Sequence, residues 1–133
     1  MESVRDLGPQ FVDNPHEIVG HDGAYSIPLN EEALWFFGDT LIGKRVPGES
    51  LWYPNGKPVG PYDMSGKGLI KRMINNSGLI LRDKTGKYGL RSYRYICDEK
   101  GNVRQLVPRL PDEHPDKYRI WCVHGCFLGD KVY

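Results

Sequence analysis

Apolar and polar residues alternate over short stretches of this chain, and turn-forming residues separate the stretches. The first two stretches, 24–29 and 33–40, flank the polar turn Asn30-Glu31-Glu32. Alternation with a period of two residues is typical of β-strands that bury one face, and no segment shows a helical period. The pattern therefore predicts a β-hairpin near the N-terminus.

Similar strand-and-turn stretches recur further along. A second unit covers 73–83 and 88–97 around a turn at 84–86, and a further turn at 98–101 leads into 102–107. A third unit begins near Arg119 and turns at 129–131. Antiparallel units of roughly 40–50 residues are typical of β-propeller blades, although a sandwich of short strands fits the spacing too.

The expected fold is therefore all-β, with antiparallel propeller blades. Blade 1 would cover about 18–68, blade 2 about 69–117 and the start of blade 3 about 118–133. A ring of at least four blades needs on the order of 180 residues, so we expect an incomplete propeller in this chain. Either the chain is part of a longer propeller, or other copies complete it.

An incomplete ring predicts self-association through exposed blade edges. The first strand and 131–133 would form such edges, whose unpaired backbone groups can pair with another chain. The missing blades would also leave apolar faces uncovered near 79–81 and 120–121.

Two aspartates meet if the first hairpin has a two-residue loop. A loop of Asn30 and Glu31 pairs Tyr25 with Phe36 and, carried further, Asp22 with Asp39. Opposed residues in an antiparallel pair share a face, so two carboxylates would share one site. Glycosidases use such pairs of carboxyl groups. The two groups lie about 5–5.5 Å apart in enzymes that retain the anomeric configuration and about 6.5–9.5 Å apart in enzymes that invert it. The alternative is that both aspartates only cap turns.

Other polar and aromatic residues are candidates for substrate binding. Trp52 and Tyr53 lie in a long Gly- and Pro-rich connection from 43 to 68, where they would stack on sugar rings or simply anchor the loop. Asn75, Asn76 and Ser77 would bind substrate hydroxyls or satisfy local backbone groups. His124 is a further candidate in the third unit.

Composition excludes several classes of function. Lys and Arg number 18 and Asp and Glu 17, a net charge of +1, which argues against nucleic-acid partners and anionic membranes. No apolar run approaches the ~18 residues of a spanning helix, and no signal peptide is visible. The expected location is therefore cytoplasmic if Met1 is the native start, and otherwise exported after removal of a signal.

The three cysteines predict neither a disulfide framework nor a metal site. Cys122, His124 and Cys126 alternate and would share one face of a strand. Neighbours on that face are about 6.5–7 Å apart, too far for three ligands that each lie about 2.0–2.3 Å from zinc. We therefore expect a buried cysteine pair, with no metal and no cofactor.

The stretch 20–43 resembles the first blade of a bacterial five-bladed propeller family long catalogued as a domain of unknown function. The shared pattern is Gly-x-Asp-Gly, then Ser, then Leu-Trp-x-Phe-Gly-Asp-Thr, here ending at Thr40. The segments 75–81 and 124–133 resemble the openings of the second and third blades.

Family members with an assigned activity are endo-D-arabinanases of mycobacterial cell-wall polysaccharide. The resemblance implies a five-bladed propeller in which Asp22 and Asp39 carry the catalysis. It implies a glycoside hydrolase that acts on an arabinan-like poly- or oligosaccharide. The alternative is a propeller that binds carbohydrate or protein without catalysis.

Overall fold

Nine β-strands and no helix make up the regular structure of the described residues, which are 4–45, 69–83, 85–114 and 117–133 of a computed structural model. Trp52 and Tyr53 lie outside these ranges. The strands are β1 (Ile18–His21), β2 (Tyr25–Pro28), β3 (Ala33–Phe37), β4 (Thr40–Gly43), β5 (Ile70–Ile74), β6 (Ser77–Leu81), β7 (Tyr93–Tyr95), β8 (Phe127–Leu128) and β9 (Lys131–Val132). The expected all-β, antiparallel class is confirmed.

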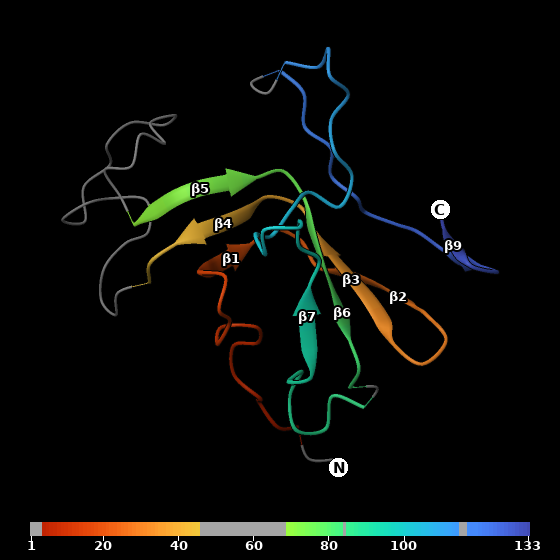
Figure 1. Cartoon of the computed structure of the whole chain (residues 1–133). Helices are drawn as coiled ribbons and strands as arrows, with labels where there is room; N and C mark the ends of the chain where they lie inside the picture. Colours follow the sequence, from red (N-terminus) through yellow and green to blue (C-terminus); the bar gives the residue numbers. More distant parts are fainter. Residues whose placement is uncertain (1–3, 46–68, 84, 115–116) are drawn as a thin grey trace.

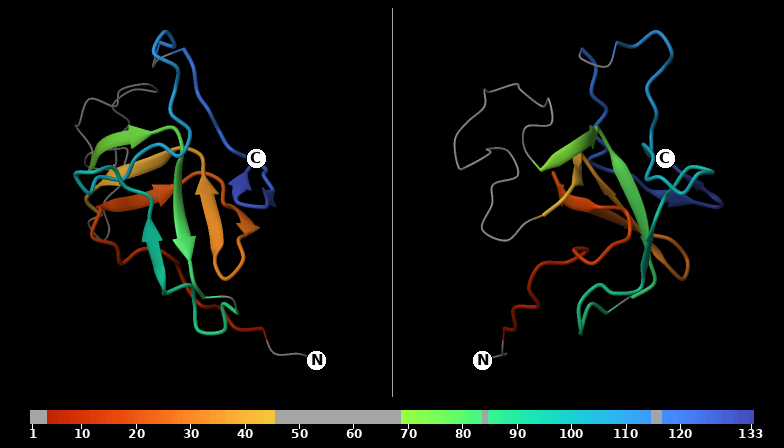
Figure 2. Two further views of the ribbon diagram at one scale, coloured as in Figure 1. Left: turned by 45° about the vertical axis from the view of Figure 1, so that its right-hand side comes forward. Right: turned by 60° about the vertical axis from the view of Figure 1, so that its left-hand side comes forward.

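Two sheets share three continuous stretches of chain. One sheet has the order β2-β3-β6-β7 and the other β1-β4-β5. β1 continues into β2, β3 into β4 and β5 into β6, and each stretch changes direction at a short interruption (Figure 1). The views in Figure 2 show the same bend, so the sheets are two arms of one structure and not two facing layers.

The first hairpin has the predicted register. Tyr25 pairs with Phe36 and Ile27 with Leu34. The backbone groups of Leu29 and Glu32 bond to each other in both directions, at 2.9 and 3.2 Å, which closes the two-residue loop. β2 is an edge strand, which suits Pro28 because proline has no N–H to donate to a neighbour.

The strands expected in two different blades form one sheet. β3 pairs with β6 over five positions and β4 pairs with β5, so the expected boundary near residue 68 does not separate two sheets. The pairing joins matching faces, because Trp35 lies opposite Leu79 and Leu34 opposite Ile80. β2-β3-β6-β7 is thus a four-stranded meander, and 118–133 contributes only the separate pair β8-β9.

The N-terminal segment covers one face of the meander. Phe11 makes edge-on ring contacts with Trp35, Phe37 and Tyr93, with ring centroids 5.6, 6.0 and 5.0 Å apart. Leu79 and Leu81 lie in the same cluster and are buried. The prediction of an uncovered apolar face at these two leucines was therefore wrong, because residues before β1 supply the cover.

The C-terminal half covers the opposite face. Ile27, Leu34 and Phe36 form its buried centre, and a group of half-buried side chains packs on it. That group contains Leu29, Ile80, Ile96, Leu106 and Cys122. Cys126 is exposed, so the expected buried cysteine pair was wrong: 119–126 crosses the sheet as an irregular segment and not as a paired strand.

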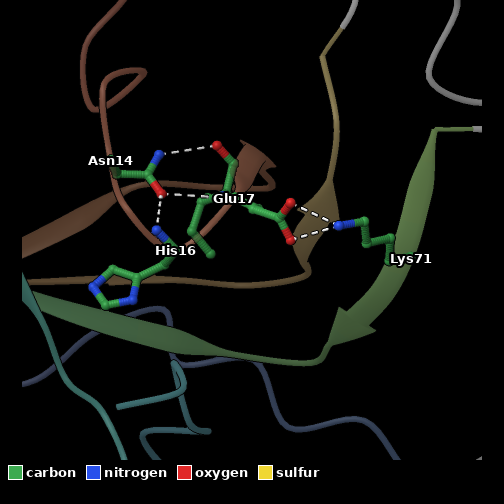
Figure 3. Close-up of polar contacts among 5 residues, drawn as sticks. Asn14, His16, Glu17 and Lys71 are labelled. Carbon is green, nitrogen blue, oxygen red and sulfur yellow. Dashed lines mark hydrogen bonds and ion pairs between the residues drawn. The ribbon is translucent and has the colours of Figure 1, made fainter.

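A side-chain clamp fixes the start of β1. The Asn14 Oδ1 atom accepts hydrogen bonds from the backbone of His16 and Ile18 at 3.1 and 3.0 Å (Figure 3). Inside this turn Glu17 has a φ of 56°, a left-handed conformation that is uncommon for a residue with a side chain. Its carboxylate lies 2.6 Å from the Lys71 Nζ atom of β5, which ties the turn to the far strand of the three-stranded sheet.

Candidate functional site

Asp22 and Asp39 lie side by side where the two sheets meet. The Asp22 N–H donates to the Asp39 carbonyl at 2.8 Å, and the Gly38 N–H donates to the Asp22 carbonyl at 2.7 Å. Two residues therefore face one, which is the arrangement of a β-bulge. The predicted adjacency of the aspartates is confirmed for the backbone, and the bulge explains why the strands bend there.

Two glycines of the aspartate motifs are required by this geometry. Gly23 has a φ of 63°, which a residue with a side chain adopts only at a cost. A Cβ atom on Gly38 would lie 3.1 Å from the Asp22 carbonyl oxygen and 3.4 Å from Trp121 Cδ1. A side chain at position 38 would therefore require the Asp22 backbone or the Trp121 ring to move by a few tenths of an ångström.

The two aspartates have different surroundings. Asp22 is exposed, whereas Asp39 is half-buried. The indole Nε1 of Trp121 donates to Asp39 Oδ1 at 3.1 Å. An indole N–H can only donate, so Asp39 Oδ1 is the acceptor of this bond. The structure thus holds Oδ1 of Asp39 in place through the indole of Trp121.

Asn75 lies at the same position along the strands as Asp39. Thr40 pairs with Ile74 and Phe37 pairs with Ser77, so this register carried through the interruption places Asn75 opposite Asp39. Asn75 is 6% exposed, and no hydrogen bond to another described residue uses its amide. Asn75 is buried, and its contact with substrate stays a prediction.

Asn76 has a structural role. Its Nδ2 atom donates to the carbonyls of Val107 and Ile120 at 3.0 and 2.9 Å, and its Oδ1 accepts from the Val107 N–H at 2.9 Å. The side chain is fully buried. These bonds fasten two segments of the C-terminal half to the bend, and a contact between Asn76 and substrate stays a prediction.

Asn76→Asp is expected to lower the free energy of unfolding by about 2 kcal/mol, because a carboxylate has no donor for the two carbonyls and leaves them unsatisfied. Urea denaturation at pH 7 measures the effect. Asn30→Asp is the matched control, since Asn30 is exposed in the hairpin loop. Equal midpoints for both variants would show that the amide does not hold the C-terminal segment.

A buried chain of hydrogen bonds lies beneath the aspartates. Ser77 Oγ is 2.7 Å from Thr40 Oγ1, which is 3.2 Å from His21 Nδ1, and His21 Nε2 is 2.8 Å from the Tyr95 hydroxyl. Thr40 donates to the Gly38 carbonyl at 3.1 Å. One assignment satisfies every group: Tyr95 donates to Nε2 of a neutral His21 that carries its proton on Nδ1, and Thr40 accepts from both His21 and Ser77.

Burial determines the pKa values of the titratable groups in this chain of hydrogen bonds. Desolvation lowers the pKa of His21 to about 4 and raises the pKa of Tyr95 above its usual value. The His21 ring also stacks on Phe37 with centroids 3.9 Å apart. The imidazole of His21 is therefore neutral in the folded protein. Ser77 is fully buried and belongs to the same chain of hydrogen bonds. A substrate contact by Ser77 stays a prediction.

His124 lies apart from the aspartates. It is exposed and lines an apolar cleft of about 470 Å³ between the meander and β8-β9. Phe36, Ile80 and Tyr133 also line the cleft, and neither Asp22 nor Asp39 does. The structure therefore does not bring His124 together with the carboxylates, and its role in substrate binding stays a prediction.

The sequence analysis did not predict the contact of Trp121 with Asp39, nor the chain of hydrogen bonds through His21. His21 pairs with Thr40 in strand register, so the same hairpin register carried one position past the aspartates would have joined them. Tyr95 and Trp121 lie 74 and 82 residues from their partners, and no local pattern announces such contacts.

The described residues contain no group of three His, Cys, Asp or Glu side chains placed to hold a metal ion. Within the same part of the chain, no helix is long and apolar enough to cross a membrane. Comparisons with known protein families, curated proteins and solved structures gave no match for this chain.

Proposed function

We propose that the protein is a glycoside hydrolase that acts on an arabinan-like polysaccharide, with Asp22 and Asp39 as its catalytic carboxylates. The observation that carries the proposal is their direct backbone pairing at a bulge, with one carboxylate exposed and one half-buried. Glycosidic bond cleavage needs two carboxyl groups in unlike roles, and unlike surroundings are how proteins separate such roles.

The neighbours of the pair support the same chemistry. Trp121 offers an exposed aromatic surface beside Asp39, and the strand register places the amide residue Asn75 opposite Asp39. Aromatic faces and amides are the groups that bind the apolar and hydroxyl sides of a sugar. On this proposal the meander is one sheet of a five-bladed propeller, completed by further chain or further copies.

The second candidate is a carbohydrate-binding propeller without catalysis. An exposed tryptophan next to a carboxylate suits sugar binding whether or not a bond is cut, so the same observation of Trp121 favours it. Self-association through blade edges remains part of both proposals, and β9 is exposed in agreement with it.

Arabinan degradation separates the two candidates. The chain, together with the further chain or copies that complete its ring, is incubated with arabinan, and new reducing ends are counted. Affinity electrophoresis in arabinan-containing gels measures binding. We expect both retardation in the gel and new reducing ends. Retardation without bond cleavage would support the binding protein, and neither result would reject both candidates.

A further inference from the structure

The backbone next to Trp121 is bonded to the centre of the bend. Asn76 binds the carbonyl of Ile120, the residue directly before it, at 2.9 Å. Asn76 itself is fully buried between β5 and β6. The backbone that carries the indole is therefore anchored to the centre of the bend.

One edge of the indole faces the aspartates. Nε1 donates to Asp39 Oδ1 at 3.1 Å, and Cδ1 lies 3.4 Å from the position that a Cβ atom on Gly38 would take. The same position lies 3.1 Å from the Asp22 carbonyl oxygen. The pyrrole edge of Trp121 thus lies against the bulge where both aspartates sit.

More than half of the Trp121 surface is open to solvent. Trp121 is 54% exposed, although tryptophan buries more apolar area than most residues when it can. A ring that is oriented at one edge and open elsewhere is a preformed platform, because it has little conformational freedom left to lose when a ligand stacks on it.

We propose that Trp121 is the substrate-positioning residue of this site. Its face stacks on the sugar ring next to the bond that is cut, while its N–H holds Asp39 Oδ1 so that Oδ2 points to the reacting oxygen. The inference rests on the proposed function and deepens it, since it assigns the saccharide a defined place beside the carboxylates.

Two variants separate the roles of the ring and of its N–H. Trp121→Ala removes both, so its dissociation constant for arabinan and its KM are expected to rise about tenfold, the size of a stacking contact. Trp121→Phe keeps an aromatic face and loses the N–H. Its dissociation constant is expected to stay within about twofold of wild type while kcat falls, because Asp39 is no longer oriented.

Tyr88→Ala is the control, since Tyr88 is an exposed aromatic residue in another part of the chain at 61% exposure. Binding is measured by affinity electrophoresis and by titration with arabino-oligosaccharides of defined length, and circular dichroism checks each fold. A purely structural Trp121 would change thermal unfolding and leave the affinity of the folded variants unaltered. That result, or equal affinity of Trp121→Ala and wild type, would overturn the inference.

The same experiment separates this inference from the proposed hydrolysis. If wild type binds arabinan without cutting it, and Trp121→Ala loses that binding, hydrolysis is rejected and the role of Trp121 in binding stands. If wild type cuts arabinan and Trp121→Ala has an unchanged KM, hydrolysis stands and the inference is rejected. A wild-type chain that binds no arabinan would reject both.

Discussion

Replacing either aspartate by asparagine is expected to lower kcat on arabinan by about 10²–10⁴-fold, the usual contribution of a positioned acid or base. Asparagine has nearly the shape of aspartate, and at position 39 its carbonyl oxygen can still accept the Trp121 N–H. The change therefore removes the proton-transfer or nucleophilic function of Asp22 or Asp39 while it keeps the contacts around them.

The control and the double variant sharpen this prediction. Asp130→Asn changes an exposed carboxylate in the turn between β8 and β9, and its kcat should equal that of wild type. Asp22→Asn combined with Asp39→Asn should cost little more than either change alone, because residues that act as a unit are not additive. Turnover above half of wild type in either single variant would contradict the catalytic assignment.

Acidification is expected to destabilise the protein through His21, which is neutral in the core. Burial lowers its pKa from 6.5 to about 4. Between these pH values the unfolded chain binds a proton that the folded chain does not, so stability falls as the pH falls. The loss is about 1.4 kcal/mol per pH unit and about 3 kcal/mol over the whole window.

His21→Gln isolates this contribution because glutamine can hydrogen-bond but does not titrate. Urea denaturation between pH 7 and pH 4 should show a shallower loss of stability in this variant than in wild type. His124→Gln is the control, since His124 is exposed and should keep the wild-type slope. Parallel curves for wild type and His21→Gln would show that the imidazole is not the group responsible.

The local part of the fold could be predicted from the sequence. Alternation on both sides of Asn30-Glu31 determined the hairpin, its loop and its register, and these placed Asp22 beside Asp39. Such features depend on residues close together in the sequence and on the two-residue period of a strand, and both can be recognised in the sequence.

The non-local part could not be predicted in the same way. The pairing of β3 with β6 joins strands on either side of a long connection, and spacing alone assigned them to different blades. Phe11, with no strand of its own, covers the leucines of β6. The hydroxyl of Ser77 likewise lies 2.7 Å from that of Thr40, a partner 37 residues earlier in the chain.

The pairing of Gly43 with Ile70 has a consequence for how this scaffold can diversify. The ends of the intervening connection meet at adjacent strands, so a change in its length alters the entropy of closing this loop. Doubling or halving such a loop changes that entropy by only about 0.6 kcal/mol. The connection can therefore lengthen at a small cost in closure entropy, while the paired strands at its two ends keep the register that places Asp22 beside Asp39.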